Sequence, residues 1–217
     1  MKEISYRLTF VIIMFIAVSL DTSAQTADAK AIIGKTSQIY KQWDGMAINF
    51  ITHIRSDKSG ISESFEGTIV MKGDKFVLTT PDMMTWFDGV TQWTYMPRTG
   101  EVNMNTPSGS DLRFLNPMIL LEDYQEDFNV SYIGESTSAN AKTACDIALT
   151  PKKKDDIERI EIQIEKSTSL PAKLVVTMRN NMRNVIHVKE LKEDSPPDDM
   201  FTFPENKYPD VEIIDLR

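Results

Sequence analysis

The side chains that most often carry catalysis or bind metals are scarce in this sequence. Its two histidines, His53 and His187, do not form a His-x-x-x-His spacing, and the single cysteine, Cys145, cannot belong to a paired-cysteine zinc site. The sequence also lacks the Gly-x-Ser-x-Gly nucleophile turn and the Gly-x-Gly-x-x-Gly nucleotide-binding turn. We therefore predict no catalytic residue, no metal site and no cofactor. Both histidines are expected at solvent-facing strand positions, and Cys145 is expected to be a buried, inert thiol.

Acidic residues could also form a functional site, because a pair of carboxylates can act as general acid and general base or can bind Ca²⁺. Neighbouring side chains point apart, however, so we expect the acidic pairs to be solvated helix ends and loops. With 32 acidic and 24 basic residues, the chain has a net charge of −8, which argues against nucleic acid or an anionic membrane surface as a partner. The acidic pairs are Glu122-Asp123, Glu126-Asp127 and Asp198-Asp199.

The N-terminus has the pattern of a secretory signal peptide. Lys2 and Arg7 precede an uncharged apolar run over residues 8–20, and the small residues up to Ala24 form a cleavage site. The run is shorter than the roughly 18 to 20 residues of a membrane-spanning helix. Gln25, not a cysteine, follows the cleavage site, so the mature chain lacks the thiol for lipid attachment there. We predict a signal peptide over residues 1–24 and a single soluble periplasmic domain over residues 25–217.

The periodicity of apolar residues predicts a mainly β fold. A helix is expected over residues 27–42, and from residue 45 the apolar period changes from about four to two. Short strands joined by tight turns, such as Asp88-Gly89, predict a meander up to residue 104. Residues 107–125 have helical spacing and are expected to form one or two short helices. Further strands are predicted over residues 128–133, 145–150, 157–166, 172–177, 185–191 and 211–216.

Several segments of this meander resemble one known family in their order and spacing. The longest is residues 65–76, FEGTIVMKGDKF, and it is followed by residues 87–95 and by Glu101-Val102. The strand that ends at Lys152 and the terminal segment from Tyr208 to Arg217 support the resemblance. Together they resemble the periplasmic outer-membrane lipoprotein carriers of the LolA-like type, over nearly the whole mature chain. They resemble especially the branch that lacks the longer second hairpin.

This resemblance implies a fold and a function. The fold would be α+β, with a strongly curved antiparallel sheet that forms an incomplete barrel. An N-terminal helix and short lid helices would cover an apolar cavity in it. A protein of this kind is not an enzyme. As a monomer it would bind acylated lipoproteins, receive them from an inner-membrane lipoprotein-releasing transporter and carry them toward the outer membrane and, where one exists, an acceptor there.

We predict the binding residues from the resemblance and from the alternation of apolar residues along the strands. We expect one apolar lining on the strands and one on the lid. From periodicity alone, the same methionines and aromatic residues fit an ordinary packed core better, and only the resemblance favours a ligand cavity. The predicted lipid-binding residues are Ile48, Phe50, Ile69, Met71, Phe76, Leu78, Trp86, Trp93 and Tyr95 on the strands, and Leu112, Leu115, Met118 and Ile119 on the lid.

The sequence departs from the family pattern at the expected lid latch. Typical members have an Arg-Pro pair after the glycine-containing strand, and the arginine is thought to hold the lid. Here Lys72-Gly73 stands instead, so we predict Lys72 as a partial replacement, although it lacks the planar fork of arginine.

The alternative function is a non-enzymatic envelope module that senses or binds lipids or glycolipids, because one fold serves several functions. The absence of a further predicted domain favours a free carrier.

Overall fold

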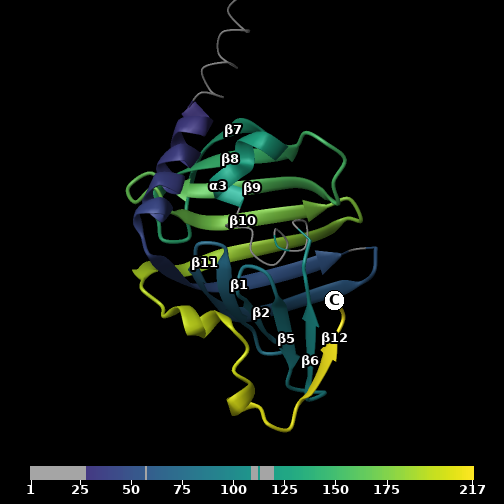
Figure 1. The fold of residues 1–217 in the computed structure, drawn as a ribbon. Coiled ribbons are helices and arrows are strands. Elements are labelled where there is room, and N and C mark those ends of the chain that lie inside the picture. The colour runs from purple at the N-terminus through teal and green to yellow at the C-terminus, as the bar shows by residue number, and fades with distance from the viewer. Residues whose placement is uncertain (1–27, 57, 109–111, 113–119) are drawn as a thin grey trace, which may run out of the picture.

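The computed structural model describes residues 28–56, 58–108, 112 and 120–217 of the chain (Figure 1). The predicted signal peptide, residues 1–24, lies outside this part. Three of the predicted lid residues, Leu115, Met118 and Ile119, also lie outside it.

A twelve-stranded open sheet forms most of the described structure (Figure 1). Its strands follow the order β12-β6-β5-β4-β3-β2-β1-β11-β10-β9-β8-β7, so the sheet does not close into a complete barrel. The first six strands are β1 (Gly45–Ser56), β2 (Ile61–Lys72), β3 (Lys75–Thr79), β4 (Met84–Phe87), β5 (Gln92–Met96) and β6 (Glu101–Asn105). The others are β7 (Phe128–Thr137), β8 (Thr143–Pro151), β9 (Ile157–Glu165), β10 (Pro171–Met178), β11 (Met182–Asp194) and β12 (Glu212–Asp215).

The strands lie where alternating apolar residues predict them, and their turns have local causes. Gly73, between β2 and β3, has a φ of 56°, which favours glycine. Between β4 and β5, the Asp88 carboxylate accepts hydrogen bonds from the backbone N–H groups of Val90 and Thr91 at 2.9 and 2.8 Å. These local features favour the β2–β3 and β4–β5 hairpins, and the predicted meander is confirmed.

The last strand corrects the prediction of a fully antiparallel sheet. β12 pairs with β6 in parallel, with Ile213 opposite Val102. Two short 3-10 helices, η2 (Asp198–Phe201) and η3 (Glu205–Lys207), lie between β11 and β12. Because this long connection carries the chain back along the sheet, its last strand can run in the same direction as β6.

The two faces of the sheet pack against different parts of the chain. On one side, here called the inner face, apolar side chains form one cluster with helix 28–42 and with Tyr124 of α3 (Leu120–Asp127). Figure 1 shows helix 28–42, in purple, along one end of the strands β8–β10, and α3 in front of β8 and β9. On the opposite side, the outer face, a second cluster joins β3, β4 and β6 to Phe201 and Phe203 of the C-terminal segment.

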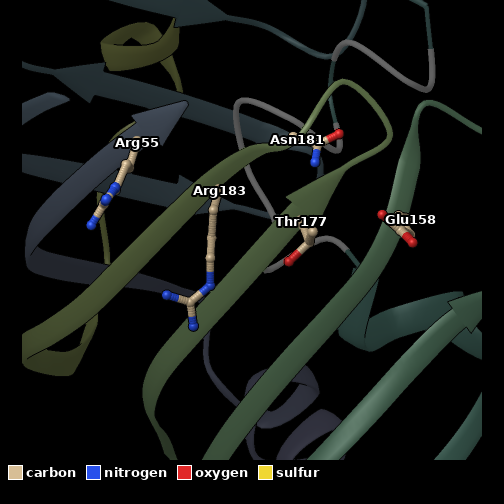
Figure 2. Close-up of a pocket in the computed structure, with 5 residues that line it drawn as sticks. All are labelled: Arg55, Glu158, Thr177, Asn181 and Arg183. Carbon is tan, nitrogen blue, oxygen red and sulfur yellow. The ribbon is translucent and has the colours of Figure 1, made fainter. Parts of the chain in front are cut away.

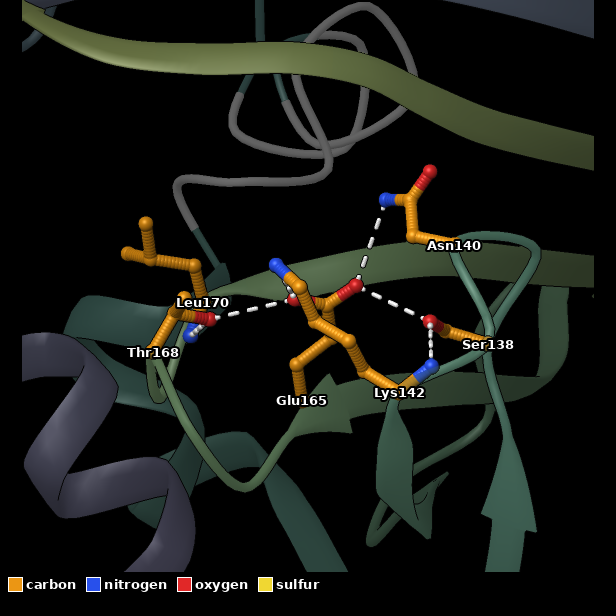
Figure 3. Close-up of polar contacts among 6 residues, drawn as sticks. All are labelled: Ser138, Asn140, Lys142, Glu165, Thr168 and Leu170. Atoms are coloured by element: carbon orange, nitrogen blue, oxygen red, sulfur yellow. Dashed lines mark hydrogen bonds and ion pairs between the residues drawn. The ribbon is translucent and has the colours of Figure 1, made fainter.

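A buried carboxylate joins two turns at one end of the sheet (Figure 3). Glu165, which is 5% exposed, accepts hydrogen bonds from Ser138 Oγ at 2.9 Å and from Lys142 Nζ at 2.9 Å. Asn140 and Thr168 add bonds at 3.3 and 3.4 Å. Burial opposes ionisation of Glu165, but the bonds from Lys142, Ser138 and Asn140 outweigh it and hold the pKa below its ordinary value. The β7–β8 and β9–β10 turns are therefore tied through one charged group.

Helix 28–42 is attached to the same region. Thr36 Oγ1 donates a hydrogen bond to the backbone oxygen of Ser169, in the β9–β10 turn, at 2.7 Å. Tyr124 of α3 donates a hydrogen bond from its hydroxyl to the backbone oxygen of Lys30 at 3.4 Å. Both helices are thus tied to one another and to one end of the sheet, which fixes their position over the inner face.

Candidate functional site

The inner face of β1–β4 is lined continuously by buried apolar side chains. Ile48 on β1 lies opposite Ile69 on β2, and Ile69 lies opposite Leu78 on β3. A second row crosses the same strands, from Met46 through Met71 and Phe76 to Phe87. The rings of Phe76 and Phe87 have their centroids 5.5 Å apart. These positions carry no charged side chain, and none is more than 7% exposed.

Phe50 lies at the less buried end of this surface. It is half-buried, packs against the same cluster and has Gly67 as its partner on β2. Both residues line a surface pocket of about 480 Å³ that also involves Thr79, Thr80 and Lys189. A side chain at position 50 is therefore accessible from outside and still in contact with the apolar cluster.

Three of the predicted lining residues lie on the opposite face. Phe76 pairs with Phe87, and Val77 pairs with Trp86, so even-numbered residues of β3 face the same way as odd-numbered residues of β4. Trp86 therefore faces away from Phe76, and Trp93, its partner on β5, does the same. The prediction that these aromatic residues share one face with Phe76 and Ile48 is wrong.

The outer-face aromatic residues have partners within the chain. The ring of Trp86 meets that of Phe203 edge to face, with centroids 5.3 Å apart. Tyr208 lies between Tyr95 and Phe203, with centroid distances of 4.8 and 5.4 Å. The C-terminal segment thus covers this part of the outer face. Trp86, Trp93 and Tyr95 do not lie beside the inner-face residues that were predicted with them.

The inner face becomes polar toward the edge of the sheet, which the pattern of the sequence did not predict. Leu78 is followed across the strands by Thr85 and then Thr94, and Phe87 is followed by Gln92. Thr85 is fully buried and Gln92 is 9% exposed. Cross-strand register, which the sequence does not display, is the signal that would have placed these residues beside the apolar rows.

The predicted lid and its latch are only partly described. Leu112 is half-buried and packs against the inner-face cluster. Lys72 Nζ lies 3.4 Å from Asp44 Oδ2, 3.4 Å from the backbone oxygen of Pro196 and 3.6 Å from Asp198 Oδ1. These contacts attach the C-terminal segment to the β2–β3 hairpin. The role of Lys72 as a lid latch stays a prediction.

A charged pocket opens near the ends of β1, β9, β10 and β11. Figure 2 shows its lining, with Arg55 and Arg183 on neighbouring strands and with Glu158, Thr177 and Asn181 around them. Its volume is about 340 Å³. Its side chains are polar or charged, so it differs in character from the apolar inner face and suits ions or polar groups.

The two histidines lie on neighbouring strands, β1 and β11. His53 and His187 are neighbours, with ring centroids 5.8 Å apart; His53 is exposed, as predicted, and His187 is half-buried. Burial, then the charges of His53, Lys173 and Lys189, lower the pKa of His187. Across the described ranges, no three histidine, cysteine or acidic side chains gather as a metal site would require.

The predicted burial of Cys145 is confirmed, since its side chain is 3% exposed. Tyr132 on β7 donates a hydrogen bond from its hydroxyl to Cys145 Sγ at 3.8 Å. Burial and then this contact raise the pKa of Tyr132 to about 12. Among the helices in the described part of the chain, none has the length and apolar character needed to cross a membrane.

The sequence matches one family profile. The family is described as outer membrane lipoprotein carrier protein LolA, and the match covers residues 20–180. A comparison with curated protein sequences found no match.

Solved structures are similar to this fold at low sequence identity. An uncharacterized conserved protein from Thermus thermophilus is 11% identical, with a TM-score of 0.54 over 87% of this chain and 99% of that one. A DUF1329 family protein from Desulfovibrio piger is 14% identical, with a TM-score of 0.50 over 82% of this chain and 97% of that one. A LolA superfamily protein from Nitrosomonas europaea is 12% identical, with a TM-score of 0.45 over 81% and 97%. The first two likenesses concern the fold alone.

Proposed function

This chain belongs to the LolA family of outer membrane lipoprotein carrier proteins, and we propose that it is a periplasmic carrier whose inner face binds the acyl chains of lipoproteins. It receives them from a releasing transporter in the inner membrane and carries them toward the outer membrane, to an acceptor where one exists. It acts as a monomer and catalyses no reaction. Export by the N-terminal signal peptide places it in the periplasm.

The observation that carries this proposal is the uncharged apolar surface across β1–β4. Acyl chains have no polar groups to recognise, so a carrier needs a continuous apolar area more than directional contacts. The rows of Ile48, Ile69 and Leu78, and of Met71 and Phe76, supply that area. Methionine adapts to irregular shapes, which suits a flexible chain.

The strength of such binding is compatible with a carrier. Each methylene removed from water contributes about 0.8 kcal/mol, so ten methylenes on the inner face would contribute about 8 kcal/mol before the costs of association. The sheet is open and its two edge strands, β12 and β7, are far apart in the strand order. An open sheet leaves a route for release, which a closed barrel would not.

The proposal is tested by binding of a synthetic triacylated lipopeptide to the purified mature protein. The lipopeptide should displace a hydrophobic dye, and the same peptide without acyl chains should not. Ile69→Asn places a polar group on the inner face and should weaken lipopeptide binding at least tenfold. Ser64→Asn, at an exposed position on the same strand, is the matched control and should bind as the wild type does.

Loss of folding is distinguished from loss of binding by a second variant. Phe50→Ser changes a half-buried position and should leave the sheet folded, as circular dichroism would check. It should still weaken lipopeptide binding. If the wild type binds the acylated and the unacylated peptide equally, the proposed carrier function is wrong.

A further inference from the structure

A small polar group stands beside the apolar rows of the inner face. It consists of Thr85 on β4 and of Gln92 and Thr94 on β5. Thr85 lies opposite Leu78 on β3, and Gln92 lies opposite Phe87 on β4. Since side chains of cross-strand partners lie on the same face, all three polar side chains face the side that carries Phe76 and Leu78. The outer face of the same strands carries Trp86 and Trp93.

The polar group satisfies most of its own hydrogen bonds. Gln92 Nε2 donates a hydrogen bond to Thr94 Oγ1 at 3.2 Å, and the hydroxyls of Thr94 and Thr85 are joined at 3.3 Å. In this orientation of the Gln92 amide, Nε2 is the atom that faces Thr94. Its other atom, Oε1, is fully buried and accepts no hydrogen bond from any residue that the structure describes. Gln92 as a whole is 9% exposed, so water has little access to it.

A buried carbonyl oxygen without a donor is unfavourable and therefore uncommon. A ligand that brings a donor to this position removes the penalty, whereas a purely hydrocarbon ligand does not. The donor must also be close to an acyl chain, because Gln92 is adjacent to Phe87 and Phe87 contacts Phe76. An amide N–H at the head of an acyl chain meets both conditions.

We infer that Gln92 Oε1 accepts a hydrogen bond from the N–H of an N-acyl amide whose chain lies along the inner face. This inference rests on the proposed function, and it adds the chemical class of the ligand head. The apolar rows bind the chain without regard to its head group. Gln92, held by Thr94, selects an amide over an ester, which has no donor at the same position.

Two pairs of matched ligands test the selection. The first pair is N-(2-hydroxyethyl)palmitamide and 2-hydroxyethyl palmitate, which differ only in an N–H that is replaced by oxygen. The second pair is an N-palmitoyl tripeptide and its depsipeptide, in which an ester replaces the acyl amide. The wild type should bind each amide about fivefold to tenfold more tightly than its ester. Preference in both pairs indicates recognition of the amide itself, and preference only in the second assigns the site to acylated peptides.

Variants assign the preference to Gln92. Gln92→Leu keeps the approximate size and removes the acceptor, so the amide-to-ester affinity ratio should fall to about one while ester binding persists. The amide and the ester are compared on the same variant. A general loss of affinity caused by loosening of the fold therefore affects both ligands and leaves their ratio unchanged. Gln163→Leu is the control, since Gln163 is also buried but donates its hydrogen bond to Ser136. It should keep the wild-type ratio.

The outcomes separate this inference from the proposed function. If the wild type binds none of the four ligands, the carrier function fails and the inference fails with it. If amide and ester bind equally well, or if Gln92→Leu retains the preference, acyl binding stands and the assignment of Gln92 is wrong.

Discussion

Phe50 lies directly opposite Gly67 on the neighbouring strand, and a Cβ atom at position 67 would lie 2.5 Å from Phe50 Cζ. Such an atom would also lie 3.0 Å from the backbone oxygen of Thr79. The aromatic ring thus occupies the space that a side chain at position 67 would need. Gly67 therefore allows the ring to lie over position 67 at one end of the apolar surface.

Gly67→Ala should destabilise the protein by about 1 to 3 kcal/mol, because the added methyl group overpacks this contact. Urea unfolding followed by circular dichroism measures the change. Gly34→Ala is the matched control: no atom lies within 4 Å of a Cβ at this helical position, and the helix should gain about 0.5 to 1 kcal/mol. Equal effects of the two substitutions would contradict the steric account.

The Glu165 network should contribute to stability in a pH-dependent way. Glu165→Gln should cost about 1 to 3 kcal/mol at pH 7, because a buried group loses its charge-assisted hydrogen bonds. The folded-state pKa of Glu165 is lowered from the ordinary value of 4.5. Its stabilisation is therefore present in full above pH 4.5 and is lost as the pH falls through the folded-state pKa.

Denaturant unfolding of the wild type and of Glu165→Gln between pH 3 and pH 7 checks this dependence. The difference between them should be constant at higher pH and should shrink below pH 4.5. Lys142→Met is a second probe, since it removes one donor at 2.9 Å and leaves the carboxylate in place. A difference that grows on acidification would refute the assigned direction.

Phe203→Ala should destabilise the protein by about 3 to 5 kcal/mol, because Phe203 is 4% exposed and its ring packs between Trp86 and Tyr208. The fluorescence of Trp86 should shift to longer wavelength as the C-terminal segment loosens. Met200→Ala, at a 40% exposed position in the same segment, should change stability by less than about 0.5 kcal/mol. Similar losses for both variants would argue against a packed outer-face cluster.

Lys72→Met separates two roles for this lysine. Its described contacts predict faster hydrogen exchange in residues 198–201, whereas the lid-latch role predicts faster release of an acyl peptide. The free-energy effect should be below about 1 kcal/mol, since exposed ion pairs contribute little. Lys58→Met, at an exposed turn, is the control. Faster release with unchanged exchange would instead support the lid-latch role.

The three tryptophans report on the two faces separately. Trp43 packs against the inner-face cluster, and Trp86 and Trp93 belong to the outer-face cluster. A palmitoyl peptide with a bromine-labelled chain should quench a variant that retains only Trp43 more strongly than one that retains only Trp93. Phenylalanine replaces the other two tryptophans in each variant. Stronger quenching of Trp93 would place the chain on the outer face and contradict the proposed site.

The sequence by itself determined the positions of nearly all strands and the helix that precedes them. Alternation of apolar residues is a local property, and turn residues such as Gly73 act through their own backbone preferences. The β2–β3 hairpin and the helix at residues 28–42 were therefore predictable. The buried position of Cys145 was predictable for a similar reason, because a small apolar side chain in a strand favours the core.

Tertiary structure alone decided which side chains share a face. Thr80 and Met83 close the connection between β3 and β4 with hydrogen bonds at 2.9 and 3.2 Å. This four-residue connection sets Phe76 opposite Phe87, and a shift of one residue would have placed Trp86 there instead. The parallel pairing of β12 was equally hidden, because it depends on packing across a long connection. Alternation shows that a strand has two faces; only pairing in space shows which residues of neighbouring strands share one of them.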